Sequence, residues 1–192
     1  MFKLTPGGAA YQSVIRSPMK IDLLKSTENI DSLVELINSA YRGKDGERRW
    51  TSESHLVSGD RIDLIDLQKV IESENCDLFV ASIGDKLVGC ICSTEYPDYI
   101  EYGLYAISPE FHGMGFGKKL LAHVERVKET KNKKYRVSVV SKNTALIEFY
   151  TKRGYTKLSD RLPYPVHLNV GDPLVDNLDL TVLQKRITIW SS

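Results

Sequence analysis

The chain has 192 residues, of which 42% are hydrophobic and 27% are charged, and its formal net charge is +1. This length and balance predict one folded domain and exclude a disordered or fibrous chain. They argue against a dedicated binder of polyanions, and no apolar run approaches the ~18 residues of a membrane span.

The first part of the chain carries short strand and helix patterns. Residues 1–20 include no hydrophobic segment of a secretory signal, and we expect them to form a loosely attached tail on a domain spanning 21–192. Ser26 and Thr27 are candidate caps for the first helix. From hydrophobic spacing, the predicted elements are a strand at 21–24, a helix over 30–41, a loop over 42–61 and a second helix over 64–71.

The pattern changes to strands in the second part of the chain. Turn residues separate three β-rich runs, which predicts an antiparallel meander. A strand–helix–strand crossover follows, and such a crossover makes its two strands parallel. The predicted elements are strands at 77–83, 87–94 and 100–107, a helix over 116–127, a strand at 135–140, a helix capped by Asn143, and strands at 155–158 and 178–184. Together they predict a single-domain α/β fold with a mixed central sheet flanked by about four helices.

The chain has three cysteines, Cys76, Cys90 and Cys92, and two of them lie two residues apart in an apolar stretch. We expect reduced core thiols, as in a cytoplasmic protein, and not a disulfide framework. No CxxC pair is present, and the four histidines show no ligand spacing, so no metal site is predicted.

Residues 107–120 carry the most informative motif, a strand followed by three glycines and a helix. Helix N-termini expose about four unpaired N–H groups and a partial positive charge, and glycines let a ligand approach that backbone. The loop Gly113–Gly117 contains no capping side chain, and Lys118 and Lys119 place positive charge in the first turn, which costs about 0.3–1 kcal/mol each. A bound phosphate would offset both effects, so the motif predicts an anion site; the alternative is a flexible turn with surface lysines.

Two nucleotide-binding motifs fail at defined positions. A P-loop requires GxxxxGK followed by Ser or Thr, whereas this loop is one residue shorter and Lys118 is followed by Lys119. A Rossmann loop requires GxGxxG and an acidic residue after the next strand, whereas the spacing here is GxGxG and that strand ends at Ser141-Lys142.

The charge is unevenly distributed along the chain. Residues 110–157 carry a net charge of +8 and the remainder carries −7. This segment is either a solvated face with intrachain pairing or a site for a polyanionic ligand. A nucleic acid is not expected as partner, because no aromatic-rich basic strand or recognition helix accompanies the charge.

The glycine loop resembles the acetyl-CoA loop of GCN5-related N-acetyltransferases (GNAT), which reads Gln/Arg-x-x-Gly-x-Gly/Ala. Gly115 and Gly117 match, and His112 stands where the family usually has Gln or Arg. The run 143–155 resembles a second signature of the family, Asn-x-x-Ala/Ser-x-x-Phe-Tyr-x-Lys-x-Gly-Phe/Tyr. The resemblance covers roughly residues 21–185 and implies a GNAT-like fold.

The resemblance also implies that the chain transfers an acetyl group from acetyl-CoA to a primary amine of a small molecule or peptide. In the family, backbone groups of the strand before the loop pair with the pantetheine arm, and the pyrophosphate lies over the loop. The residues assigned to acetyl-CoA in this way are Tyr105, Ala106, Ile107, His112, Gly113, Met114, Gly115, Phe116, Gly117, Lys118 and Asn143.

Two residues are candidates for proton transfer. Tyr150 occupies the position of the family's usual general acid, and a phenol with a pKa near 10 can protonate a departing thiolate. Its alternative role is that of a half-buried aromatic residue. Glu101 starts the strand that leads to the loop and is the candidate base, acting through water; its alternative role is that of an exposed strand charge.

In the family, the first two helices and the last long loop form the acceptor wall. The acceptor is therefore expected to lie against the polar and aromatic clusters of these two regions, the second of which includes Arg161, Pro163, Tyr164 and Pro165. The candidates are Tyr41, Trp50, Glu53 and Arg61. A cationic amine and an amino-acid-like acceptor both remain open. A non-catalytic acyl-CoA-binding module is the alternative function, and the chain is expected to be a monomer or homodimer with no membrane partner.

Overall fold

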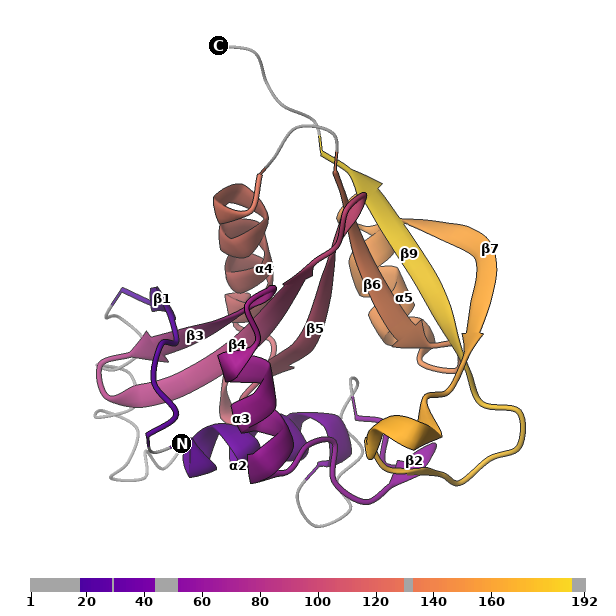
Figure 1. The fold of residues 1–192 in the computed structure, drawn as a ribbon, viewed down its shortest axis with the longest axis horizontal. Helices are drawn as coiled ribbons and strands as arrows, with labels where there is room; N and C mark the ends of the chain where they lie inside the picture. Colours follow the sequence, from indigo (N-terminus) through magenta and orange to yellow (C-terminus); the bar gives the residue numbers. More distant parts are fainter. Residues whose placement is uncertain (1–17, 29, 44–51, 130–132, 188–192) are drawn as a thin grey trace, which may run out of the picture.

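The computed structural model describes residues 18–28, 30–43, 52–129 and 133–187. Within these ranges, a seven-stranded sheet in the order β1-β3-β4-β5-β6-β9-β7 carries four α-helices, and a small second sheet pairs β2 with β8 (Figure 1). In the large sheet β5 and β6 are parallel, and the other neighbouring strands are antiparallel. The predicted mixed α/β fold, with its meander and parallel crossover, is confirmed.

The strands are β1 (Lys20–Leu23), β2 (Val57–Ser58), β3 (Cys76–Ile83), β4 (Lys86–Glu95), β5 (Tyr99–Ile107), β6 (Lys134–Val140), β7 (Thr156–Pro163), β8 (Asp172–Pro173) and β9 (Asp179–Arg186). The helices are α2 (Asp31–Arg42), α3 (Leu64–Glu72), α4 (Phe116–Val127) and α5 (Thr144–Thr151), with short 3-10 turns η1 (Pro109–Phe111) and η2 (Val166–Leu168).

Two local predictions about helix starts have different outcomes. Asn143 caps α5 as expected, and its side chain accepts a hydrogen bond from the Leu146 N–H at 3.1 Å. The predicted cap of α2 is wrong, because Ile30 occupies the N-cap position without a side-chain bond. Ser26 instead accepts a hydrogen bond from the Glu28 N–H within its own turn.

The last part of the sheet is longer than predicted. The expected strand at 155–158 continues to Pro163, because the backbone from Arg161 to Pro163 pairs with β9. Nearly every side chain of β7 is exposed, so this strand shows no alternation of apolar and polar residues. Its structure depends on pairing with a neighbour, which a local pattern does not report.

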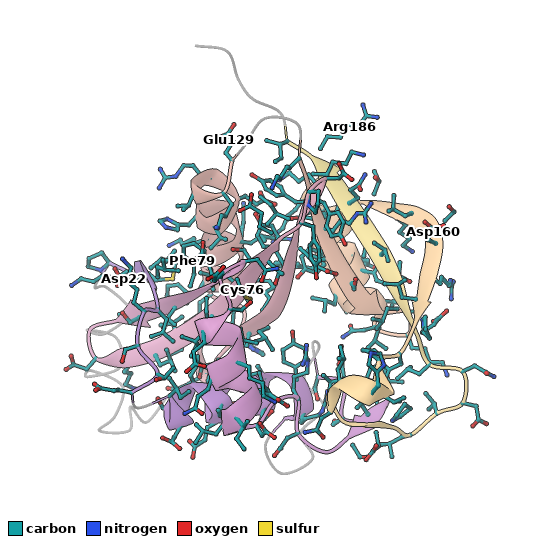
Figure 2. The ribbon with its side chains drawn as sticks, viewed as in Figure 1. Asp22, Cys76, Phe79, Glu129, Asp160 and Arg186 are labelled. Atoms are coloured by element: carbon teal, nitrogen blue, oxygen red, sulfur yellow. A yellow bond between two sulfur atoms is a disulfide. The ribbon has the colours of Figure 1, made fainter. Side chains whose placement is uncertain are left out.

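The helices divide the core between the two faces of the sheet. Helices α2 and α3 cover one face with residues such as Ile37 and Leu67, and α4 and α5 cover the other with residues such as Leu120 and Ile147 (Figure 1). Asp22 on β1 and Asp160 on β7 mark the two outer strands at opposite ends of the sheet (Figure 2). None of the described helices is long and apolar enough to cross a membrane.

Strand β5 contains a β-bulge at Leu104, whose φ angle is 44°. Cys92 pairs with Gly103 and Cys90 pairs with Ala106, so β5 fits one extra residue between these two pairs. Because an extra residue reverses the alternation of side chains, Tyr102 and Tyr105 both face the core under α4 and α5, whereas Leu104 faces α2.

The bulge coincides with the point at which β5 and β6 separate. The two strands pair only from Tyr99 to Tyr102 on β5, and beyond this point they diverge (Figure 1). The backbone of Gly103–Ile107 therefore has no strand partner on that side within the described residues. Unpaired strand groups at such an edge can pair with an extended ligand.

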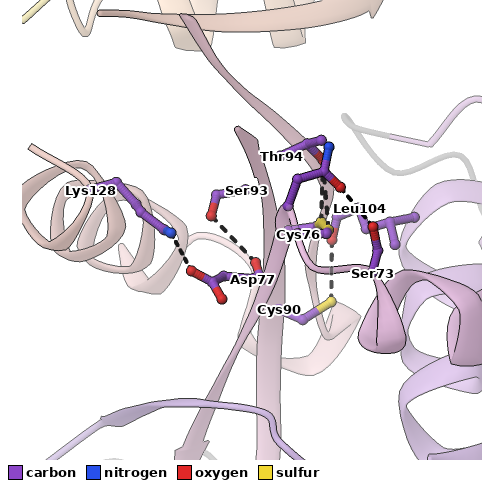
Figure 3. The surroundings of a disulfide bond; sticks show 10 residues. Ser73, Cys76, Asp77, Cys90, Ser93, Thr94, Leu104 and Lys128 are labelled. Carbon is purple, nitrogen blue, oxygen red and sulfur yellow. Dashed lines mark hydrogen bonds and ion pairs between the residues drawn. A yellow bond between two sulfur atoms is a disulfide. The ribbon is translucent and has the colours of Figure 1, made fainter. Parts of the chain in front are cut away.

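The prediction of three reduced thiols is wrong for two of the cysteines, because Cys76 on β3 and Cys92 on β4 form a disulfide (Figure 3). The hairpin register places Cys76 opposite Thr94, which makes Cys92 its diagonal neighbour on the same face of the sheet. Cys90 remains a free, buried thiol, and burial raises its pKa to about 12. The prediction failed because this pairing depends on how β3 aligns with β4, whereas along the chain Cys92 lies nearest to Cys90.

Intrachain pairing accounts for part of the basic segment. Lys128 pairs with Asp77 on β3, and Lys133 pairs with Glu95 at the end of β4. Lys118, in contrast, is exposed at the start of α4. Lys128 and Lys133 therefore fit intrachain pairing, whereas Lys118 fits a site for a polyanionic ligand.

Replacing Leu183 with alanine should lower the free energy of unfolding by about 2–5 kcal/mol, because this β9 side chain is fully buried and its loss leaves a cavity. Leu162→Ala on the outer strand β7 is the matched control, since that side chain is 44% exposed, and it should change stability by about 0.5 kcal/mol. Urea unfolding measures both, and equal losses would contradict this placement of the core.

Candidate functional site

A cavity of about 260 Å³ lies between the free edge of β5, the glycine loop and α5. Nine of the residues predicted to bind a cofactor line it: Tyr105, Ala106, Ile107, His112, Gly113, Gly115, Phe116, Gly117 and Lys118. Met114 and Asn143 do not line it. Met114 is 40% exposed, and Asn143 is buried at the start of α5.

The start of α4 forms one end of this first cavity. Gly115 is the N-cap residue with a φ angle of 79°, its position has no side-chain cap, and the first turn contains no acidic residue. A Cβ atom at Gly117 would lie 2.8 Å from the Tyr105 hydroxyl oxygen, so only glycine lets α4 approach β5 this closely. The N–H groups of this first turn have no intrahelical partner and carry the positive end of the helix dipole. The start of α4 therefore has the uncapped N–H groups on which the predicted anion site depends.

His112 connects the loop to the end of β5. Its Nε2 lies 2.8 Å from the Ile107 carbonyl oxygen, and because a carbonyl only accepts, Nε2 carries the proton. The imidazole thus stabilises the turn between the strand and the helix. This contact gives the histidine a structural task besides any contact with a ligand.

Tyr105 presents a polar atom that lacks a partner. Its hydroxyl is buried and forms no hydrogen bond in the part of the chain that the structure describes, although its side chain lines the cavity. A buried hydroxyl without a partner costs about 1–3 kcal/mol. A ligand that forms a hydrogen bond with this hydroxyl would remove the cost. A polar, extended cofactor arm carries groups that can form such a bond.

A second, smaller cavity of about 110 Å³ adjoins the first. Tyr41, Glu53, Tyr105 and Leu146 line both cavities, so the two meet at these side chains. Of the predicted acceptor residues, Tyr41, Glu53 and Arg61 line the second cavity, whereas Trp50 lies outside the described residues. Ser138, Tyr150, Tyr164, Pro165, Val170 and Leu180 are among the other lining residues.

Tyr150 lies in the wall of the second cavity. Its side chain is only 3% exposed and packs against the rings of Tyr105, Phe149 and Tyr155. Burial raises the pKa of Tyr150 well above its ordinary value of 10, and the neighbouring Tyr105 adds to this effect. The hydroxyl therefore keeps its proton at neutral pH, and the raised pKa makes it a weaker acid than an ordinary phenol.

Glu101, the predicted base, lines neither cavity. Its carboxylate accepts a hydrogen bond from the Ser138 hydroxyl at 2.8 Å, and Ser138 lines the second cavity. Any action of Glu101 on a ligand would therefore have to pass through Ser138 or water.

Glu53 is held in place by a buried arginine. Arg42 Nη1 donates to Glu53 Oε2 at 3.4 Å, and both side chains are about nine-tenths buried. Arg42 also donates to the backbone carbonyls of Gly59 at 2.8 Å and Val170 at 2.6 Å. Burial raises the pKa of Glu53, and the neighbouring Arg42 opposes this rise without reversing it.

Five lining residues of the first cavity were missed by sequence reasoning, and three of them come from α5 and the turn after it. Leu146, Phe149 and Arg153 project from α5 and the turn after it, and the Arg153 guanidinium lies 3.4 Å from the centroid of the Phe149 ring. Their spacing of three and four residues marks one face of a helix, so the signal was available once Asn143 had been identified as the cap. Ser138, in the second cavity, carries no comparable signal, whereas Tyr164 and Pro165 belong to the cluster of the last loop that was expected at the acceptor.

The comparisons agree with this architecture. Residues 31–155, more than half of the chain, match the sequence model of the acetyltransferase (GNAT) family. The fold is similar to that of smu.2055 from Streptococcus mutans UA159, with a TM-score of 0.67 and 21% identity over 88% of this chain and 99% of that one. No curated protein sequence matches the chain.

Two further solved structures are named for their activity. The ribosomal-protein-S18-alanine N-acetyltransferase from Escherichia coli has a TM-score of 0.64 and 14% identity, over 91% of this chain and 97% of that one. A GNAT family acetyltransferase from Elizabethkingia anophelis with acetyl-CoA bound has a TM-score of 0.62 and 17% identity, over 87% and 97% of the two chains. At these identities the similarity establishes the fold.

The buried carboxyl of Glu53 should make stability depend on pH. Because its pKa is raised above the ordinary 4.5, the folded protein holds this proton more tightly than the unfolded chain, and its contribution to stability is lost as pH rises through the raised value. Glu53→Gln removes the titrating group, so the stability of the variant relative to wild type should improve as pH rises above 4.5. Urea unfolding at a series of pH values measures this, and parallel curves for the two proteins would contradict it.

Proposed function

We propose that this chain acetylates a primary amine of a small molecule or peptide. The chain belongs to the acetyltransferase (GNAT) family and is therefore an acyltransferase with acetyl-CoA as its co-substrate. The observation that carries this proposal is the meeting of two cavities at Tyr105, with Tyr150 in the wall of the second. One cavity has the strand edge and helix end that suit a coenzyme, and the other has polar and charged groups that suit an acceptor.

The residues of the first cavity fit acetyl-CoA. Backbone groups of Gly103–Ile107 would pair with the extended pantetheine arm, and the N–H groups at the start of α4 would bind the pyrophosphate. Lys118, exposed at the same helix end, adds a positive charge beside these groups. Acetyl-CoA, when bound, supplies an acetyl thioester that an amine can attack.

Tyr150 and Glu101 would move the protons of this reaction. As the carbon–nitrogen bond forms and the carbon–sulfur bond breaks, Tyr150 donates its proton to the departing thiolate sulfur. Glu101 receives the proton that the amine loses, through Ser138 and water, and returns it to solvent. Tyr150 regains a proton from solvent, so the net reaction of a neutral amine yields one amide and one thiol.

A non-catalytic acyl-CoA-binding module is the second candidate, and the position of Glu101 outside both cavities favours it. Such a module would be stabilised by coenzyme without releasing free thiol. At a ligand concentration of 100 times Kd, the stabilisation would be about 2.7 kcal/mol. Thermal unfolding together with a free-thiol assay on an amine panel separates the two functions.

Replacing Tyr150 with phenylalanine should lower kcat by roughly 10²–10⁴-fold, because the leaving thiolate loses its proton donor, while the affinity for acetyl-CoA stays within about threefold. Tyr155→Phe is the matched control. It removes a buried hydroxyl that bonds to Glu125 at 2.8 Å and lines neither cavity, so kcat should be retained. Free-thiol release at saturating substrate measures both, and an unchanged kcat in Tyr150→Phe would exclude the acid role.

Lys118→Glu should weaken coenzyme A binding by about tenfold or more, because it places a negative charge beside the proposed pyrophosphate site. Lys119→Glu is the control, since it makes the same change of charge one residue later, at a side chain that does not line the cavity. Its affinity should fall by less than about threefold. Isothermal calorimetry with coenzyme A compares the variants, and equal effects would assign both lysines to nonspecific surface charge.

A further inference from the structure

The first loop brings three charged side chains together at the second cavity. Glu53 and Arg61 line this cavity, and Arg42 lies directly behind Glu53. Arg42 already has three partners, the Glu53 carboxylate and two backbone carbonyls. Its charge is therefore committed to fixing Glu53, and it is not available to a ligand.

Arg61 differs from Arg42 because its charge interacts with that of Glu53 without forming an ion pair in the part of the chain that the structure describes. Asn38 Oδ1 fixes its backbone by accepting from the N–H groups of Arg61 at 2.8 Å and Ile62 at 3.1 Å. Its guanidinium lies 5.3 Å from the centroid of the Tyr41 ring. Among the described residues, no carboxylate forms an ion pair with Arg61.

Among the described residues, the lining of the second cavity carries one carboxylate, Glu53, and one guanidinium, Arg61. Glu53 is already paired with Arg42, so this lining offers no second carboxylate to Arg61. A partly buried cation is stabilised by an anion that reaches it in place of water. A polyamine would place another positive charge beside Arg61, whereas a carboxylate would neutralise it, and Arg binds carboxylates in a bidentate geometry.

The two charged groups also lie at different positions along the cavities. Glu53 lines both cavities and so marks their junction, beside Tyr105 where the thioester is proposed to arrive. Arg61 lines only the second cavity, away from the glycine loop. An acceptor bound between them would place its amine at the junction and its anionic group away from the junction, at Arg61. The volume of about 110 Å³ limits the enclosed part of this acceptor to a compact molecule.

We propose that the acceptor is a compact primary amine that also carries a carboxylate, of the amino-acid class, with the amine at Glu53 and the carboxylate at Arg61. This inference rests on the proposed acetyltransferase function and selects between the two acceptor types that the sequence left open. The chemistry of the step is unchanged, since the amine still forms the amide and Tyr150 still protonates the thiolate.

The test compares matched acceptors with purified full-length protein. Each of several amino acids is assayed beside its primary amide and its decarboxylated amine, with acetyl-CoA as donor and free-thiol release as the readout. The amino acids should have a kcat/KM at least about tenfold higher than that of the amides and amines, which lack the carboxylate. This is the effect expected from one charged hydrogen-bonded pair.

Variants of Arg61 test whether this residue causes the preference for acceptors that carry a carboxylate. Arg61→Gln should lower kcat/KM for the amino acid by roughly 10- to 100-fold and change that of the amide by less than about threefold. Arg61→Lys should restore part of the preference because it keeps the charge. Arg161→Gln is the matched control, since Arg161 pairs with Asp179 at 2.8 Å on the outer strand and lines neither cavity, and it should keep the full preference.

The outcomes separate this inference from the proposed function. Equal or better turnover of the decarboxylated amines, or an equal effect of Arg61→Gln on both acceptor types, would overturn the inference and leave the acetyltransferase function in place. Binding of acetyl-CoA without turnover of any amine in the panel would overturn both. Calorimetry with acetyl-CoA on Arg61→Gln verifies that the variant is folded.

Discussion

The geometry of the site depends on the bulge at Leu104, where β5 stops pairing with β6. The extra residue turns Tyr105 toward the same core as Tyr102 and frees the next stretch of backbone from its neighbour. A continuous sheet would have no room here for either cavity. The disrupted ladder is thus the feature that gives a packed α/β domain room for two adjoining cavities.

Several contacts support the bulge and the open edge. The Cys90 thiol donates to the Leu104 carbonyl oxygen at 3.2 Å, so a buried side chain satisfies a backbone group that the bulge displaces from the ladder. The disulfide between Cys76 and Cys92 fixes the register of the adjacent hairpin (Figure 3). At the other end of the opening, His112 binds the Ile107 carbonyl and Gly117 lets α4 pack closely. The site is therefore held by groups on both sides of the sheet.

Sequence reasoning predicted the features that depend on local pattern. The glycine loop, the Asn143 cap and the crossover were predictable because they depend on spacing along a single stretch of chain. Features that depend on register were not predictable in the same way. The disulfide requires the offset between β3 and β4, and β7 requires its pairing with β9, since its own side chains are mostly exposed.

The candidate site follows the same division. Except for Asn143, the predicted residues of the coenzyme side lie between residues 105 and 118, and nine of the eleven line the first cavity. The proposed acceptor side is assembled from distant segments, and Ser138 becomes visible only when the fold is known. Glu101 illustrates the difficulty, because its strand was correctly predicted while its side chain points to Ser138 and not to either cavity.

The contact between Arg42 and the Val170 carbonyl joins residues that are 128 positions apart. Closing a loop of this length costs more entropy than forming a local contact. Because Val170 lies late in the chain, the contact with Arg42 can form only after nearly all of the polypeptide has been synthesised. The glycine loop and α5, by comparison, are close neighbours along the chain. A nascent chain leaving the ribosome should therefore bring the glycine loop and α5 together before the contact between Arg42 and Val170 completes the wall of the second cavity.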